Sequence, residues 1–128
     1  MSSKESVPYE TTWRVRDQCL CLATQRTARV LARKFDEAFR PLGITSGQFS
    51  LLMSLNRDAP PPMRAVASLM AMDRTTLTAN LKPLAKRGFL VVLVDPADQR
   101  GRLLKLTRKG MAVIKAAVPI WERTHREI

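Results

Sequence analysis

Residues 72–110 have the sequence MDRTTLTANLKPLAKRGFLVVLVDPADQRGRLLKLTRKG, in which a helical pattern leads into two apolar runs. Asp73 is a good N-cap residue for the helix. Three leucines follow at the spacing of one helix face, namely Leu77, Leu81 and Leu84. Gly88 stands where a glycine commonly terminates a helix. The pattern therefore predicts a helix over residues 74–87 with one buried apolar stripe.

The apolar runs after this helix predict a β-hairpin. Residues 89–94 are rich in β-branched side chains and residues 102–106 combine apolar and basic ones, while residues 95–101 form a polar turn. A helix followed by a basic hairpin is the second half of a winged helix-turn-helix. Such a helix fits the major groove of duplex DNA, and the hairpin beside it can reach phosphates or the minor groove.

The chain upstream supplies the first half of the motif. Residues 64–70 predict a short helix, and residues 71–72 a turn before Asp73. Its inner side is expected to carry Val66, Ala67, Leu69 and Met70. Thr45 and Gln48 have the spacing of a capping box, so another helix is expected to begin there. We assign residues 45–106 to a DNA-binding region.

Two longer helices flank this region. Residues 11–40 contain no Gly or Pro and predict one long helix, too long to be buried on a small domain, so part of it should pack against another chain. Thr107 is expected to cap a last helix, which Pro119 should kink. The expected fold class is mainly α with a small β-hairpin wing, in a single domain over residues 1–128, with residues 11–40 and 107–128 as dimerisation helices.

Charge favours a polyanionic partner. Lys and Arg number 22 against 11 Asp and Glu, a net charge of +11, and the excess is concentrated in residues 74–109. Nucleic acid fits this excess first and an anionic membrane surface second, although a merely basic protein is also consistent with it. No apolar run approaches the ~18–20 residues of a membrane span and the N-terminus lacks a signal-peptide pattern, so we expect no membrane partner and a cytoplasmic location.

Helical geometry predicts the DNA-facing side chains. The candidates on or beside the face opposite the leucine stripe, or at the helix entry, are Arg74, Thr75, Thr76, Thr78, Lys82 and Lys86. Threonines can contact base edges and lysines suit phosphates, although a Thr-rich face can also be merely solvated. In the wing the candidates are Gln99, Arg100 and Arg102. Asp98 is close enough in sequence to orient one of these arginines, or to form a surface ion pair of little energetic weight.

Taken together, these motifs resemble the MarR family of bacterial transcription regulators. The matching residues are Asp73-Arg74-Thr75-Thr76-Leu77-Thr78, Lys86-Arg87-Gly88, Asp95, Asp98 and Arg100, and Leu106-Thr107 with Gly110. LGITSGQFSLL at residues 42–52 is also similar to the family. The resemblance implies a homodimer on a pseudo-palindromic operator, and a salt link between Asp73 and Arg100. It also implies a repressor released by a small aromatic ligand or, as an alternative, by thiol oxidation.

Two departures from the family pattern affect these expectations. Many relatives carry Arg where this chain has Ala79, so an inherited base preference does not transfer. The family usually has a further helix beyond the position of Ile128. We expect either that this helix is absent from this chain or that dimerisation depends on residues 11–40.

The cysteines leave three uses open. Cys19 and Cys21 stand at i and i+2 of the predicted helix, where they point to opposite faces and cannot form a disulfide with each other. Cys21 lies near the reactive cysteine of the hydroperoxide-sensing branch of the family, so redox sensing, ordinary burial and some other use are all considered. No metal site is expected, because the one histidine, His125, is distant.

Other functions find less support in the sequence. One histidine, no clustered carboxylates and no phosphate-cradling glycine loop leave nothing to build an enzyme site, and we expect no cofactor. The alternative function is a non-specific architectural DNA- or RNA-binding protein, which Ala79 favours. Four side chains could line a pocket for an aromatic acid, but such residues more often belong to a plain core, so we do not assign them as a site; they are Trp13, Arg16, Phe49 and Met53.

Overall fold

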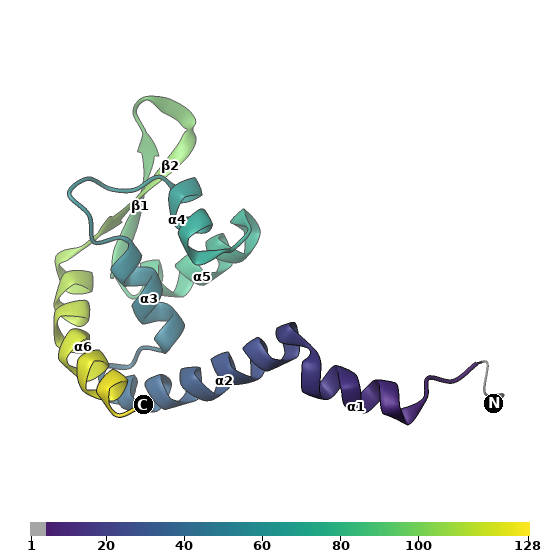
Figure 1. Ribbon diagram of the computed structural model, residues 1–128. Helices are drawn as coiled ribbons and strands as arrows, with labels where there is room; N and C mark the ends of the chain where they lie inside the picture. Colours follow the sequence, from purple (N-terminus) through teal and green to yellow (C-terminus); the bar gives the residue numbers. More distant parts are fainter. Residues whose placement is uncertain (1–4) are drawn as a thin grey trace.

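The computed structural model describes residues 5–128, which form six α-helices, one 3-10 helix and a two-stranded sheet (Figure 1). In chain order these are α1 Tyr9–Gln18, α2 Leu20–Phe39, η1 Arg40–Leu42, α3 Ser46–Ser54, α4 Met63–Met70, α5 Arg74–Lys86, β1 Leu90–Asp95, β2 Asp98–Leu106 and α6 Arg108–Arg126. The predicted fold class, mainly α with a hairpin wing, is confirmed. No helix within residues 5–128 is long and apolar enough to cross a membrane.

The prediction of one helix over residues 11–40 is wrong. The backbone of Cys19 is extended, with φ −73° and ψ 112°, and it separates α1 from α2. The two helices, here called the arm, project to one side of the remaining elements, here called the body (Figure 1). No residue of α1 is buried, and in α2 only Phe39 is. Because no residue of α1 is buried, tertiary contacts do not hold α1 in line with α2 as one straight helix.

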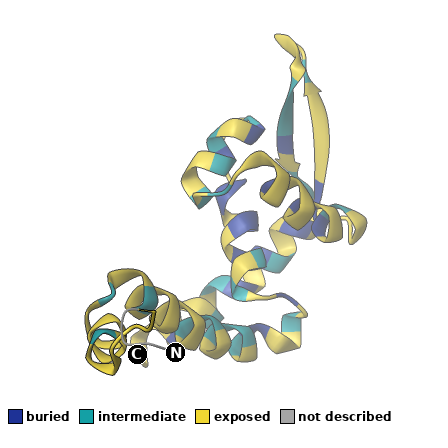
Figure 2. Cartoon of the chain, turned by 90° about the vertical axis from the view of Figure 1, so that its right-hand side faces the viewer, coloured by how far each residue is buried: buried dark blue, intermediate teal, exposed yellow. Residues whose placement is uncertain are grey.

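The core lies in the body. Figure 2 shows the buried residues gathered there, while the arm is mostly exposed or half-buried. The predicted leucine stripe of α5 is confirmed, since Leu77, Leu81 and Leu84 are each at most 3% exposed. Leu69 corrects the predicted inner side of α4. It is 61% exposed, and Met63, one turn and a half earlier, is buried instead.

Side-chain caps set the starts of three helices, as predicted. Thr45 accepts the N–H of Gln48, whose side chain accepts the N–H of Thr45, so the capping box is complete. Asp73 accepts the N–H of Thr76, and Thr107 accepts the N–H of Gly110. These caps satisfy N–H groups that a helix leaves free in its first turn. Helix α5, the predicted DNA-recognition helix, therefore begins at a residue that its own sequence defines.

The wing is longer and more irregular than predicted. The strands are antiparallel, with Val94 opposite Arg102 and then Asp95 opposite Asp98. The prediction placed residues 95–101 in a turn. The structure instead has a bulge within β2, which consists of Gln99, Arg100 and Gly101. Pairing continues through the polar run because Asp95 and Asp98 each accept a backbone N–H two residues further on. Such a bulge re-aims the side chains at the wing tip.

Candidate nucleic-acid interface

The recognition helix presents its predicted polar face to solvent. All six candidates are exposed, namely Arg74, Thr75, Thr76, Thr78, Lys82 and Lys86. The Asp73 cap keeps the N-terminal end of α5 ordered, and its carboxylate has a lowered pKa because the N–H of Thr76 donates to it. The N-terminal end of such a helix is the part that reaches base edges in helix-turn-helix proteins.

A groove joins α5 to the wing. It has a volume of about 290 Å³ and is lined by Met63, Arg74, Thr78, Leu81, Lys82, Ala85, Val92 and Arg102. Three of its polar lining residues come from α5 and one comes from β2. The structure thus brings Arg74, Thr78 and Lys82 together with Arg102, as a DNA-contacting surface requires.

A second hollow lies at the wing tip and collects four arginines. It has a volume of about 340 Å³, and its charged lining residues are Arg64, Arg74, Asp95, Asp98, Arg100 and Arg102. Guanidinium groups bind phosphate oxygens in a bidentate manner, so this cluster suits a DNA backbone. Sequence reasoning missed Arg64, which lies in the first turn of α4 and meets the wing only in the folded chain. Arg64 stands at the start of the helix that the sequence predicts over residues 64–70. A basic residue at that place is the signal that could have identified it as part of the basic surface.

The opposite side of α5 is less suited to DNA. Asn80 is exposed, but its side-chain amide donates to the carbonyl of Thr76 over 2.9 Å. It also lines a small hollow with Thr45 and Gln48 at the start of α3, away from the wing. Because this amide is already occupied within α5, we do not include Asn80 among the DNA-facing candidates.

The structure does not form the salt link that the resemblance implied between Asp73 and Arg100. The Asp73 carboxylate turns toward the first turn of α5, where the N–H of Thr76 donates to it over 2.7 Å. No ion pair joins Asp73 to Arg100 within residues 5–128. The free N–H groups at the helix start attract the carboxylate, so it caps α5 instead of reaching the wing.

Asp98 also acts differently from the prediction. Its carboxylate accepts the backbone N–H of Arg100 over 3.0 Å and orients no guanidinium. The guanidinium of Arg102 instead donates to the carbonyl oxygens of Gln99 and Gly101, each over 3.0 Å. Arg102 therefore holds the bulged strand in shape, while Arg100 is exposed.

The cysteines are more accessible than ordinary core cysteines. Cys19 lies at the break between α1 and α2 and is half-buried, while Cys21 is exposed on α2. Both thiols are free. Neither thiol is buried within this chain, so burial in its own core, one of the three uses left open, is not what the structure has. No group of three metal-ligating side chains occurs in the part of the chain that the structure describes.

The four side chains considered for an aromatic-acid pocket do not share one. Trp13 and Arg16 lie on α1, where the guanidinium stacks 4.6 Å from the centre of the indole ring. Phe49 is buried in the core of the body. Met53 lines a separate groove of about 330 Å³ between α3 and α6.

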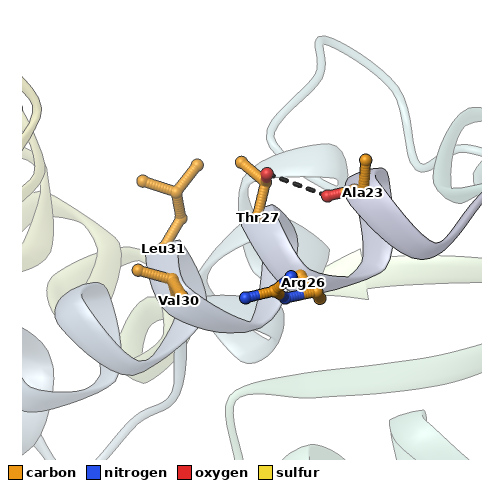
Figure 3. Close-up of a pocket in the computed structure, with 5 residues that line it drawn as sticks. All are labelled: Ala23, Arg26, Thr27, Val30 and Leu31. Carbon is orange, nitrogen blue, oxygen red and sulfur yellow. Dashed lines mark hydrogen bonds between the residues drawn. The ribbon is translucent and has the colours of Figure 1, made fainter. Parts of the chain in front are cut away.

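The arm carries a depression of its own. It is an open hollow of about 390 Å³ along α2, lined by Ala23, Arg26, Thr27, Val30 and Leu31 (Figure 3). The Thr27 hydroxyl is turned back to the carbonyl of Ala23 over 2.9 Å. The lining is mainly apolar, so this face of α2 is suited to packing more than to polar chemistry.

Comparisons with known proteins point to one family. The sequence profile of the MarR family matches residues 44–101. The structure of the M. tuberculosis transcriptional regulator MosR in complex with DNA is 36% identical, with a TM-score of 0.80, over 86% of this chain and 80% of that one. The multiple antibiotic resistance protein MarR of Escherichia coli is 35% identical over 81 residues, which are 63% of this chain and 56% of that protein.

A third relative has a known effector. It is BpsR of Bordetella bronchiseptica, whose DNA binding is regulated by 6-hydroxynicotinic acid. Its structure is 26% identical, with a TM-score of 0.74, over 84% of this chain and 77% of that one. The matches to four curated relatives cover 56–64% of the lengths of those proteins.

Proposed function

This chain belongs to the MarR family of transcriptional regulators, and from that premise we propose that it is a homodimeric repressor of a pseudo-palindromic operator. One observation carries the proposal. The exposed face of α5 and Arg102 of the wing line the same groove, so a helix for the major groove and a basic hairpin meet on one surface. The net charge of +11 favours DNA as the partner of that surface.

We assign different tasks to the two parts of the surface. The threonines of α5, Thr75, Thr76 and Thr78, contact base edges, while Lys82 and Lys86 neutralise phosphates. Arg74 lines both the groove and the wing-tip hollow, which supports a phosphate contact at the helix entry. Gln99, Arg100 and Arg102 contact the backbone or the minor groove from the wing, and Arg64 joins them.

Dimerisation through the arm is supported by its uncovered apolar residues. Trp13, Val15, Leu20 and Val30 are each more than half exposed. Apolar side chains repeated along two helices gain stability when a partner covers them. A second copy of this chain would cover both arms by the same contacts and place two recognition helices on one operator.

Release by a small aromatic ligand is the regulation we propose. Regulation of BpsR by 6-hydroxynicotinic acid supports an aromatic acid as the effector class. Thiol oxidation is the second route, supported by the exposure of Cys21. Titration of the protein–operator complex with aromatic acids, and separately with an organic hydroperoxide, distinguishes the two. In the second case a Cys21→Ser variant should no longer respond.

Selection of duplexes from a random pool, followed by anisotropy titration, tests the proposal as a whole. We expect an inverted-repeat motif and binding that weakens steeply as salt rises. Ala79, exposed at the centre of the α5 face, is the observation that favours the alternative of a non-specific architectural protein. Equal affinity for all duplexes would support that alternative and contradict the repressor.

A further inference from the structure

The C-terminal end of the recognition helix is tied to the end of the arm by one arginine. Arg87 is the C-cap residue of α5, and its guanidinium donates to the carbonyl of Gly43 over 2.6 Å. Gly43 ends the 3-10 helix that follows α2 and has φ +68°, a conformation that favours glycine. The bond therefore joins residues 44 positions apart in the sequence. It connects the end of α5 to the turn that follows α2 and η1.

Both ends of this contact are held by further interactions. The Arg87 guanidinium lies 4.6 Å from the ring centre of Phe89, which is 2% exposed and so forms a fixed platform. Lys109 of α6 donates to the Arg87 carbonyl over 2.8 Å. On the arm side, the N–H of Ser46 donates to Asp36 of α2 over 2.6 Å, which fixes the turn that contains Gly43.

From this arrangement we propose that Arg87 is a positioning residue, which sets the angle and distance between the recognition helix and the arm. The inference rests on the proposed function, because a homodimer held by its arms must place two α5 helices on half-sites about one helical turn apart. Arg87 lies at the end of α5 opposite the base-reading end. It therefore acts on DNA through the placement of the helix and not by contact.

The positioning role is tested by measuring affinity for operators that differ only in the spacing between their two half-sites. Adding or removing one base pair moves a half-site by about 3.4 Å and rotates it by about 35°. We expect the wild-type protein to bind the altered spacings about tenfold more weakly than the selected one. Arg87→Ala should reduce that preference to about threefold or less, because its recognition helices adapt to more than one spacing.

Two further variants separate positioning from charge. Arg57 also donates its guanidinium to a backbone carbonyl, but to that of Ser54 at the end of α3, three residues earlier in the chain, so Arg57→Ala removes the same charge without loosening α5. It should keep the wild-type spacing preference. Arg87→Lys keeps the charge without the planar group that stacks on Phe89, and should keep the salt dependence while losing part of the spacing preference. Full restoration by lysine would overturn the positioning role.

A measurement without DNA decides the inference if no operator is found. Spin labels at Ala28→Cys on α2 and Ala79→Cys on α5, in a Cys19→Ser and Cys21→Ser background, report the distance between arm and recognition helix. Labelled chains are mixed with excess unlabelled chains so that one pair is observed. Arg87→Ala should broaden the distance distribution, and Arg57→Ala should not. An unchanged distribution in Arg87→Ala would refute the inference, whereas absence of any preferred duplex for the wild type would refute the proposed function.

Discussion

Gly110 is the glycine of this chain at which an added methyl group meets the closest obstacle. A Cβ at this position would lie 2.1 Å from the carbonyl oxygen of Phe89 and 2.9 Å from a methyl carbon of Leu106. A carbon normally approaches a carbonyl oxygen to about 3.3 Å, so α6 would have to move by roughly 1 Å. We therefore predict that Gly110→Ala destabilises the fold.

The magnitude follows from the contacts that such a movement would break. The N–H of Thr107 donates to the carbonyl of Phe89 over 3.0 Å, and the N–H of Gly110 donates to the Thr107 hydroxyl over 3.0 Å. Overpacking lowers the free energy of unfolding by about 1–3 kcal/mol, and each of the two weakened hydrogen bonds lowers it by about 1 kcal/mol. The higher helix propensity of alanine raises it by about 1 kcal/mol. The net loss of unfolding free energy should be about 2–4 kcal/mol.

Urea unfolding followed by circular dichroism measures this loss, and Gly47→Ala is the matched control. Gly47 also lies near the start of a helix, but its added Cβ would meet nothing closer than 4.0 Å. That variant should equal the wild type or be more stable by up to about 1 kcal/mol. If Gly110→Ala unfolds at the same urea concentration as Gly47→Ala, the steric argument is wrong.

Three other changes have defined outcomes. Arg100→Ala should weaken operator binding about tenfold in an anisotropy titration with an unchanged melting curve, because the side chain is exposed at the wing tip; unaltered affinity would remove it from the interface. Lys82→Ala should weaken binding to all duplexes alike and lower the salt slope by about one, and a constant slope would argue against a phosphate contact. Asp73→Ala should destabilise the protein at neutral pH and less in acid. The N–H of Thr76 holds the pKa of Asp73 below 3.8, so the stabilisation is present above that value and is lost as the pH falls through the lowered pKa; a difference in urea midpoint that persists below the lowered pKa would contradict this.

The helix starts and the buried face of α5 could be predicted from the sequence because their causes are local. Thr45, Asp73 and Thr107 bond to N–H groups three residues further on, and this spacing is visible in the sequence. The leucine stripe repeats with the period of the helix itself. The DNA-facing residues of α5 follow from the same period, since they lie opposite or beside a stripe that is known.

The arm and the wing tip could not be predicted in the same way. Cys19 is not a helix-breaking residue, so no local signal marks the division of the arm there, and α1 has no buried residue that would hold it in line with α2. At the wing tip, the spacing of Asp98 and Arg100 suggested a side-chain pair. The bulge instead directs the Asp98 carboxylate to a backbone N–H, and it leaves Arg102 to bond the strand.

By itself, the sequence determined the order of the elements, the caps and the exposed face of α5 that we propose meets DNA, because each depends on residues within about one or two helical turns. Only the tertiary structure decided which elements share a surface. Arg64 reaches the wing-tip hollow, and Arg87 reaches Gly43, across loops whose path no local pattern encodes. Contacts of this kind depend on how the packed core orients whole helices, and they place the exposed face of α5 beside the basic wing.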